Sequence, residues 1–140
     1  VSKGGDYFGS GYPFVNYADI YKNFSLPLKV EALANSTEED RISYSVEKGD
    51  VFFTRTSETI EEIGIASTCL ETIPNAVFSG FTIRFRPDLK SSLFEGFSKY
   101  FFRSNYVRIS FTKEMNLVTR ASLSQTLLKS LTIFLPSLEE

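Results

Sequence analysis

Residues 49–57, GDVFFTRTS, constrain the fold more than any other stretch of the sequence. Gly49 and Asp50 suit a tight turn, because glycine accepts a positive φ without steric penalty. The apolar run Val51–Phe53 then predicts a strand. On strand alternation Arg55 shares a face with the first and last residues of that run, so it leaves the core side where the strand ends. We therefore expect a strand that starts in a turn and ends in one cation among hydroxyl side chains.

The remaining patterns predict a mixed α/β (α+β) domain, with short helices interspersed around one curved mixed sheet. Further strands are predicted over residues 42–46, 63–70, 76–86 and 132–136. Helices are predicted from Asp19, after a cap at Ser36 or Thr37, from Ser92 in a capping box with Glu95, and over residues 122–131. Residues 105–115 fit a helix or a strand.

The chain has 140 residues, which is enough for one domain with a real core and too few for two ordinary ones. We expect a single domain over residues 1–140, in which the Gly- and Ser-rich residues 1–10 form a flexible lead-in. A hydrophobic content of 42% with 15% aromatic residues argues for a folded chain and against disorder. The aromatic core is expected to contain Phe52 or Phe53 together with Phe81, Phe85, Phe97 and Phe101.

Cysteine usage and apolar run lengths limit where the chain works. No apolar run is long enough to span a bilayer, and no signal peptide is visible. The single cysteine, Cys69, excludes an internal disulfide, so a reducing cytoplasm is the simplest setting. Its apolar surroundings favour a small core residue over a nucleophile.

Several sequence signals of a catalytic site are missing. The chain has no histidine, which excludes histidine-based nucleophilic chemistry and histidine metal ligands. Carboxylates cluster at residues 38–40 and at Glu58, Glu61 and Glu62, at spacings typical of exposed helix faces or turns. No Gly-rich phosphate loop is present. We expect a binding protein without catalytic residues, bound metal or cofactor, with a small carboxylate-dependent hydrolase as the remote alternative.

Charge is unevenly distributed along the chain. The net charge is −2 and the pI is about 5.3, which argues against non-specific coating of nucleic acid. Residues 1–79 carry 6 Lys/Arg and 12 Asp/Glu, whereas residues 80–140 carry 9 and 5. Such asymmetry weakly indicates a polyanionic partner, although a solvated basic half explains it as well.

Four fragments in order resemble a known family: residues 11–21, 44–64, 79–87 and 119–140. Together they are similar to the target recognition domain of the specificity subunit of type I restriction–modification enzymes. The resemblance implies sequence-specific recognition of double-stranded DNA, with each such domain reading one half of a split site. It implies methyltransferase and restriction subunits as partners, and S-adenosylmethionine, Mg²⁺ and ATP would belong to those partners. It also implies that residues 134–140 start the junction to a spacer helix.

Direct readout of bases needs donors and acceptors on side chains that reach base edges. Arg55, with Thr56 and Ser57 beside it, is the first candidate for such contacts. The alternative is that Arg55 pairs with Glu58 or Glu61 and fixes the turn. The next candidates are Arg84, Arg86 and Arg120, for which a solvated face is the alternative.

An alternative function is compatible with the same family resemblance. A domain of the same subunit that is too acidic to grip DNA alone would serve protein interaction and assembly without independent DNA binding. Retention of DNA at moderate salt separates these two functions.

Overall fold

The computed structural model describes residues 5–55, 63–87, 95–115 and 128–129. Its elements in chain order are η1 (Gly5–Tyr7), β1 (Phe8–Val15), α1 (Tyr17–Tyr21), β2 (Leu33–Ala34), α2 (Glu38–Ser43), β3 (Val51–Thr54), β4 (Ala66–Thr68), β5 (Val77–Phe78), β6 (Thr82–Phe85), α3 (Glu95–Phe101) and α4 (Asn105–Met115). The mixed α+β class predicted from the sequence is confirmed.

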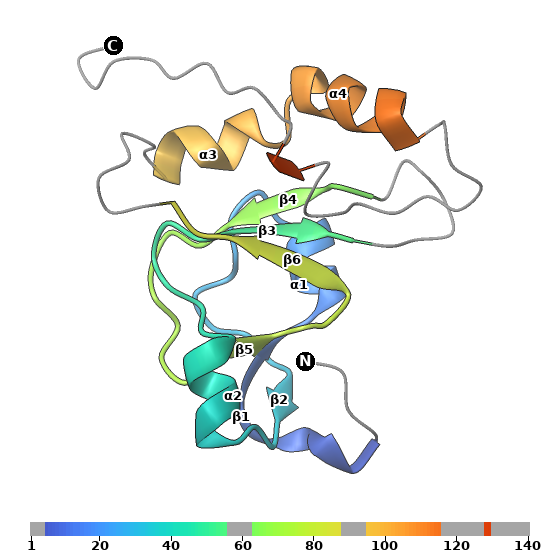
Figure 1. The fold of residues 1–140 in the computed structure, drawn as a ribbon. Coiled ribbons are helices and arrows are strands. Elements are labelled where there is room, and N and C mark those ends of the chain that lie inside the picture. Colours follow the sequence, from blue (N-terminus) through green and yellow to red (C-terminus); the bar gives the residue numbers. More distant parts are fainter. Residues whose placement is uncertain (1–4, 56–62, 88–94, 116–127, 130–140) are drawn as a thin grey trace.

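The strands form two three-stranded sheets instead of one. In the first sheet, ordered β2-β1-β5, β1 pairs antiparallel with β2 and parallel with β5. In the second, ordered β4-β3-β6, all pairs are antiparallel. Helices α3 and α4 lie on one side of the second sheet, and α1 and the first sheet lie on the other (Figure 1).

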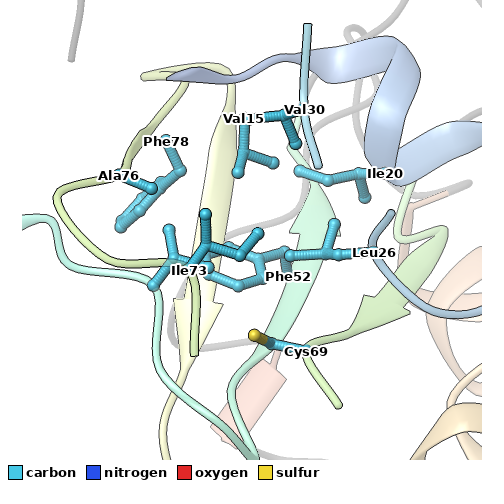
Figure 2. Packing of buried hydrophobic residues seen from close by; sticks show 10 residues of the cluster. Val15, Ile20, Leu26, Val30, Phe52, Cys69, Ile73, Ala76 and Phe78 are labelled. Atoms are coloured by element: carbon cyan, nitrogen blue, oxygen red, sulfur yellow. The ribbon is translucent and has the colours of Figure 1, made fainter. Parts of the chain in front are cut away.

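Strand β3 is buried on both of its faces. Val51 and Phe53 point toward the helical layer. They pack in one cluster with Phe102, Val107 and Phe111. Phe52 points the other way, into a cluster with Val15 and Phe78 (Figure 2). Consecutive apolar residues are typical of a strand with both faces covered, so the run VFF fits its position.

Arg103 links the helical layer to α1 and β4 through backbone carbonyls. Arg103, just after α3, donates from Nη2 to the carbonyl oxygens of Ile20 (2.7 Å), Tyr21 (3.0 Å) and Asn23 (2.7 Å). Its Nε donates to the carbonyl oxygen of Ala66 in β4. The carbonyls at the end of a helix have no partner within the helix, so this guanidinium satisfies part of that need for α1.

Helix α2 begins where the sequence predicts it but ends later. Thr37 and Asp40 form a capping box, in which each side chain accepts from the other residue's backbone N–H. The helix then runs to Ser43, so the strand predicted over residues 42–46 is wrong. Ile42 is 72% exposed on this helix, which shows that the apparent alternation there was not a core pattern.

Gly11 allows the close pairing of β1 with β2. Strand β1 begins at Phe8, within residues 1–10. Gly11 has a φ of +104°, and a Cβ there would lie 2.5 Å from the carbonyl oxygen of Ala34. Glycine is required because β2 approaches the β1 backbone so closely.

The strand predicted over residues 76–86 is interrupted by a turn, and this overturns one core prediction. The turn between β5 and β6 leaves Phe81 59% exposed, so its assignment to the core is wrong. The other expected residues are buried or partly buried: Phe52, Phe53, Phe85, Phe97 and Phe101. Residues 105–115, which fitted either element, form α4.

Some predictions fall outside the described residues. These are the cap at Ser92, most of the helix over 122–131, the strand over 132–136 and the junction over 134–140. In the part of the chain that is described, no helix is both long and apolar enough to cross a membrane.

Candidate nucleic-acid interface

Arg55 directly follows β3, and its side chain is exposed. Its backbone N–H donates to the carbonyl oxygen of Phe81 at 3.0 Å. The registered pair Thr54–Thr82 precedes this contact, so Arg55 lies opposite Phe81, one residue beyond the strands. Opposed residues of an antiparallel pair share a face, and here it is the face that carries Phe53.

Hydrogen bonds hold the residue before Arg55 and the turn opposite it. Thr54 is fully buried, and its Oγ1 accepts from the N–H of Ile65 at 2.9 Å. Ser79 organises the turn opposite: its Oγ accepts from the N–H of Phe81 at 3.1 Å, and its carbonyl accepts from Thr82 Oγ1 at 2.6 Å. Arg55 therefore extends from a well-supported strand end.

Gly64 brings the segment beside Thr54 close to α4. The Gly64 N–H donates to the Thr54 carbonyl oxygen at 2.8 Å, and its φ is +72°. A Cβ at this position would lie 2.7 Å from Cδ2 of Phe111. Both the backbone angle and the packing therefore require glycine.

The Arg86 guanidinium pairs with carboxylates of the same domain. Its Nε lies 2.7 Å from Oδ1 of Asp50 and its Nη2 lies 2.8 Å from Oδ2, while Nη1 lies 2.5 Å from Oε2 of Glu47. Nη2 also donates to Ser45 Oγ at 3.1 Å. Asp50 is buried, and its hydrogen bond raises the pKa of Arg86. This planar two-point contact ties β6 to the turn before β3.

Arg84 lies beside this cluster and is half-buried. Its Nη1 donates to the Ser45 carbonyl oxygen at 2.8 Å, and its guanidinium carbon lies 5.4 Å from the ring centre of Phe78. Burial lowers the pKa of Arg84, and the charge of Arg86 adds to this effect. Both arginines therefore already have acceptors within the fold.

The structure does not bring together Arg55, Arg84 and Arg86, the described arginines predicted to contact DNA. In the β3–β6 ladder, Arg84 lies opposite Phe52, on the other sheet face from Arg55. Arg86 follows β6 beside Asp50, at the opposite end of the ladder from Arg55. Five residue steps separate Phe81, which lies opposite Arg55, from Arg86, or about 16 Å at roughly 3.3 Å per residue. The remaining candidates, Thr56, Ser57 and Arg120, lie outside the described residues, as do Glu58 and Glu61.

Sequence reasoning missed Phe81 as a surface residue next to Arg55. It treated residues 76–86 as one alternating strand, although Ser79-Gly80 is a common turn dipeptide. That dipeptide was the available signal. It also missed the pairing of Arg86 with Asp50, which are 36 residues apart, because no local pattern encodes such a contact.

Cys69 lies in the core, as its sequence context predicted. Its thiol donates to the Glu71 carbonyl oxygen at 2.9 Å. Burial, followed by the nearby charge of Asp50, raises the pKa of this thiol to about 12, so it stays protonated near neutral pH. Within the described ranges, no group of three or more His, Cys, Asp or Glu side chains is placed to hold a metal ion.

Comparison with known proteins gives a likeness of fold. No family model matches the sequence, and no curated protein matches it in sequence. Among solved structures, the chain matches one described as the "structural basis underlying complex assembly and conformational transition of the type I R-M system", with a TM-score of 0.65 and 17% identity. The match covers 99% of this chain and 30% of that chain. The chain thus shares the fold of about a third of a chain in that system.

Proposed function

We propose that this domain reads one half of a split double-stranded DNA site, as the specificity module of a type I restriction–modification complex. The observation that carries the proposal is Arg55, an exposed residue at a strand end whose own N–H and preceding residue Thr54 are held by hydrogen bonds. A guanidinium delivered from a rigid element suits bidentate contact with the O6 and N7 atoms of guanine in the major groove.

Two further observations support this proposal. The ordered sequence fragments resemble the target recognition domain, and the fold is shared with part of a chain of a type I system. Thr56 and Ser57 would add hydroxyl donors beside Arg55, and Arg120 stays a candidate. Arg84 and Arg86 rank below them, because each would have to leave its internal acceptors to reach DNA.

In this function the domain itself is not an enzyme and needs no cofactor. Methyl transfer and cleavage would reside in the methyltransferase and restriction subunits, with S-adenosylmethionine, Mg²⁺ and ATP bound there. The domain contributes sequence recognition. Its net charge of −2 means that the isolated domain binds DNA phosphates weakly.

The test uses the full-length protein in the assembly that co-purifies with it. Bound duplexes are selected from a random library, and affinity is then measured on the selected and on scrambled sequences. We expect Arg55→Ala to cost about 1–3 kcal/mol on the selected duplex and to relax base preference at one position. Lys29→Ala is the matched control, since it removes one exposed positive charge elsewhere.

The outcomes separate the alternatives. An equal loss on selected and scrambled duplexes means that Arg55 contacts only phosphate. A lower melting temperature with unchanged affinity for both duplexes means that Arg55 fixes the turn, and the DNA-contact proposal then fails. An assembly that forms normally but selects no sequence would favour the protein-interaction function.

A further inference from the structure

Buried and exposed residues follow one another along one face of the β3–β6 ladder. Three opposed pairs line this face: Val51 with Phe85, Phe53 with Ile83, and Arg55 with Phe81. The first two pairs pack in the cluster that includes Phe102, Val107 and Phe111. The third pair is not part of this cluster, and both of its residues are exposed.

Phe81 is a large apolar side chain on a fixed backbone. It is 59% exposed, yet its N–H donates to Ser79 Oγ and its carbonyl accepts from the Arg55 N–H. A single exposed apolar residue is ordinary on a protein surface. The position of this one is distinctive, because it lies opposite Arg55, the residue proposed above to contact DNA.

We propose that Phe81 contacts the C5-methyl group of a thymine in the major groove, next to the base pair contacted by Arg55. The inference rests on the proposed function and names a second specificity-determining residue. A phenyl ring cannot form hydrogen bonds with base edges, and the thymine methyl is the apolar group presented in that groove.

The spacing of the pair agrees with this assignment. Hydrogen-bonded opposed residues have Cα atoms about 5.5 Å apart. Successive base pairs rise by about 3.4 Å. A side chain opposite Arg55 therefore reaches one or two base pairs away along the same groove.

A phenyl wedge inserted between bases is the main alternative for an exposed aromatic residue on DNA. Insertion unstacks a base step, and this cost is offset by wrapping bent DNA around more protein surface. A chain with a net charge of −2 is poorly suited to such wrapping. Contact with a methyl group needs no deformation of the duplex.

The experiment removes the methyl group alone. In the selected half-site, each thymine is replaced in turn by deoxyuridine, which pairs identically but lacks the C5-methyl. For the wild-type assembly we expect about a fourfold loss of affinity at one position, equivalent to losing one buried methyl contact. Phe81→Ala should show the same loss on the natural duplex and no further loss with deoxyuridine.

Two other variants make the result specific. Phe81→Leu keeps an apolar side chain and should retain part of the deoxyuridine sensitivity. Tyr100→Ala removes an aromatic residue of similar exposure, 61%, from α3 and should behave as wild type. Melting temperatures of all variants confirm that folded molecules are compared.

The results that overturn the inference differ from those that overturn the proposed function. Selective binding by the assembly, with no thymine whose methyl matters or with deoxyuridine sensitivity unchanged in Phe81→Ala, would overturn the inference alone. A selected half-site without thymine would do the same. Loss of partner subunits from Phe81→Ala with base preference intact would place Phe81 in a protein interface. Absence of any sequence selection would overturn both proposals.

Discussion

The Arg86 guanidinium holds the buried carboxylate of Asp50 at two points, with Nε 2.7 Å from Oδ1 and Nη2 2.8 Å from Oδ2. The same carboxylate accepts from the Glu47 N–H at 2.8 Å, so it also closes the turn before β3. This contact fixes one end of the β3–β6 ladder. Its importance for stability can be measured separately from any role in DNA binding.

We expect Arg86→Ala to lower the free energy of unfolding by about 1–3 kcal/mol, because the buried Oδ1 of Asp50 loses its guanidinium donor while Oδ2 keeps only the Glu47 N–H. Lys48→Ala is the control: it breaks the exposed pair with Glu95 (3.3 Å) and should cost less than about 1 kcal/mol. Urea denaturation of both variants measures the difference. Equal small losses would show that the Asp50 contact is dispensable.

The aromatic residues on one sheet face should differ sharply in their contribution to stability. Phe53 is fully buried and packs edge-on against Phe102, with ring centres 5.3 Å apart. Phe53→Ala should cost about 3–5 kcal/mol. Phe81→Ala should stay within about 0.5 kcal/mol of wild type, as is usual for exposed positions. Thermal denaturation of the pair tests this, and comparable losses would contradict the exposure of Phe81.

Substitutions at Gly49 and Gly64 allow the destabilising effects of backbone strain and of steric conflict to be measured separately. Gly49 has a φ of +94°, and a Cβ added there would meet no atom within 4 Å, whereas a Cβ at Gly64 would lie 2.7 Å from Phe111. Gly49→Ala should cost about 1–2 kcal/mol through its backbone angle. Gly64→Ala should cost more, and combining it with Phe111→Leu should cost less than the sum of the two changes. Strict additivity in this double-mutant cycle would exclude the steric component.

Alkaline pH should weaken the fold through Cys69. Burial raises the pKa of its thiol from 9.0 to about 12, so the folded state disfavours the thiolate. The stabilising contribution is therefore complete below pH 9 and is lost as the pH rises toward 12. Denaturation curves at pH 8, 10 and 11 should show a decline that is smaller in Cys69→Ala.

The same burial predicts slow chemical modification. At pH 8 the native thiol should react with a disulfide reagent far more slowly than the urea-unfolded chain. The rate of thiol labelling, with and without urea, measures this. Fast labelling of the folded protein would mean that Cys69 is accessible.

Local signals in the sequence predicted local structure well. The apolar run of β3, the positive φ of Gly49 and the cap at Thr37 are all encoded within a few residues, and each is present. The helix over residues 105–115 remained ambiguous because its partner, the covered face of β3, is distant in sequence.

The candidate site was predictable only where it depends on strand parity. Parity placed Arg55 at the exposed end of the face that carries Phe53, and the side chain is exposed there. It could not reveal that Arg86 meets Asp50, because that contact depends on which strands pair. It also could not reveal that Phe81 leaves the core, because the turn at Ser79 shortens the strand.

Burial on both faces of β3 has a consequence for how the strand finds its place. In a strand with one solvent-exposed face, a shift of register by one residue moves the apolar side chains into solvent. The free-energy cost of this exposure prevents the shift. Val51, Phe52 and Phe53 would meet apolar surroundings after such a slip as well, so hydrophobicity alone does not oppose it. Polar contacts at the two ends of the strand therefore hold it in register. Asp50 contacts Arg86 at one end, and Thr54 Oγ1 accepts from the Ile65 N–H at the other.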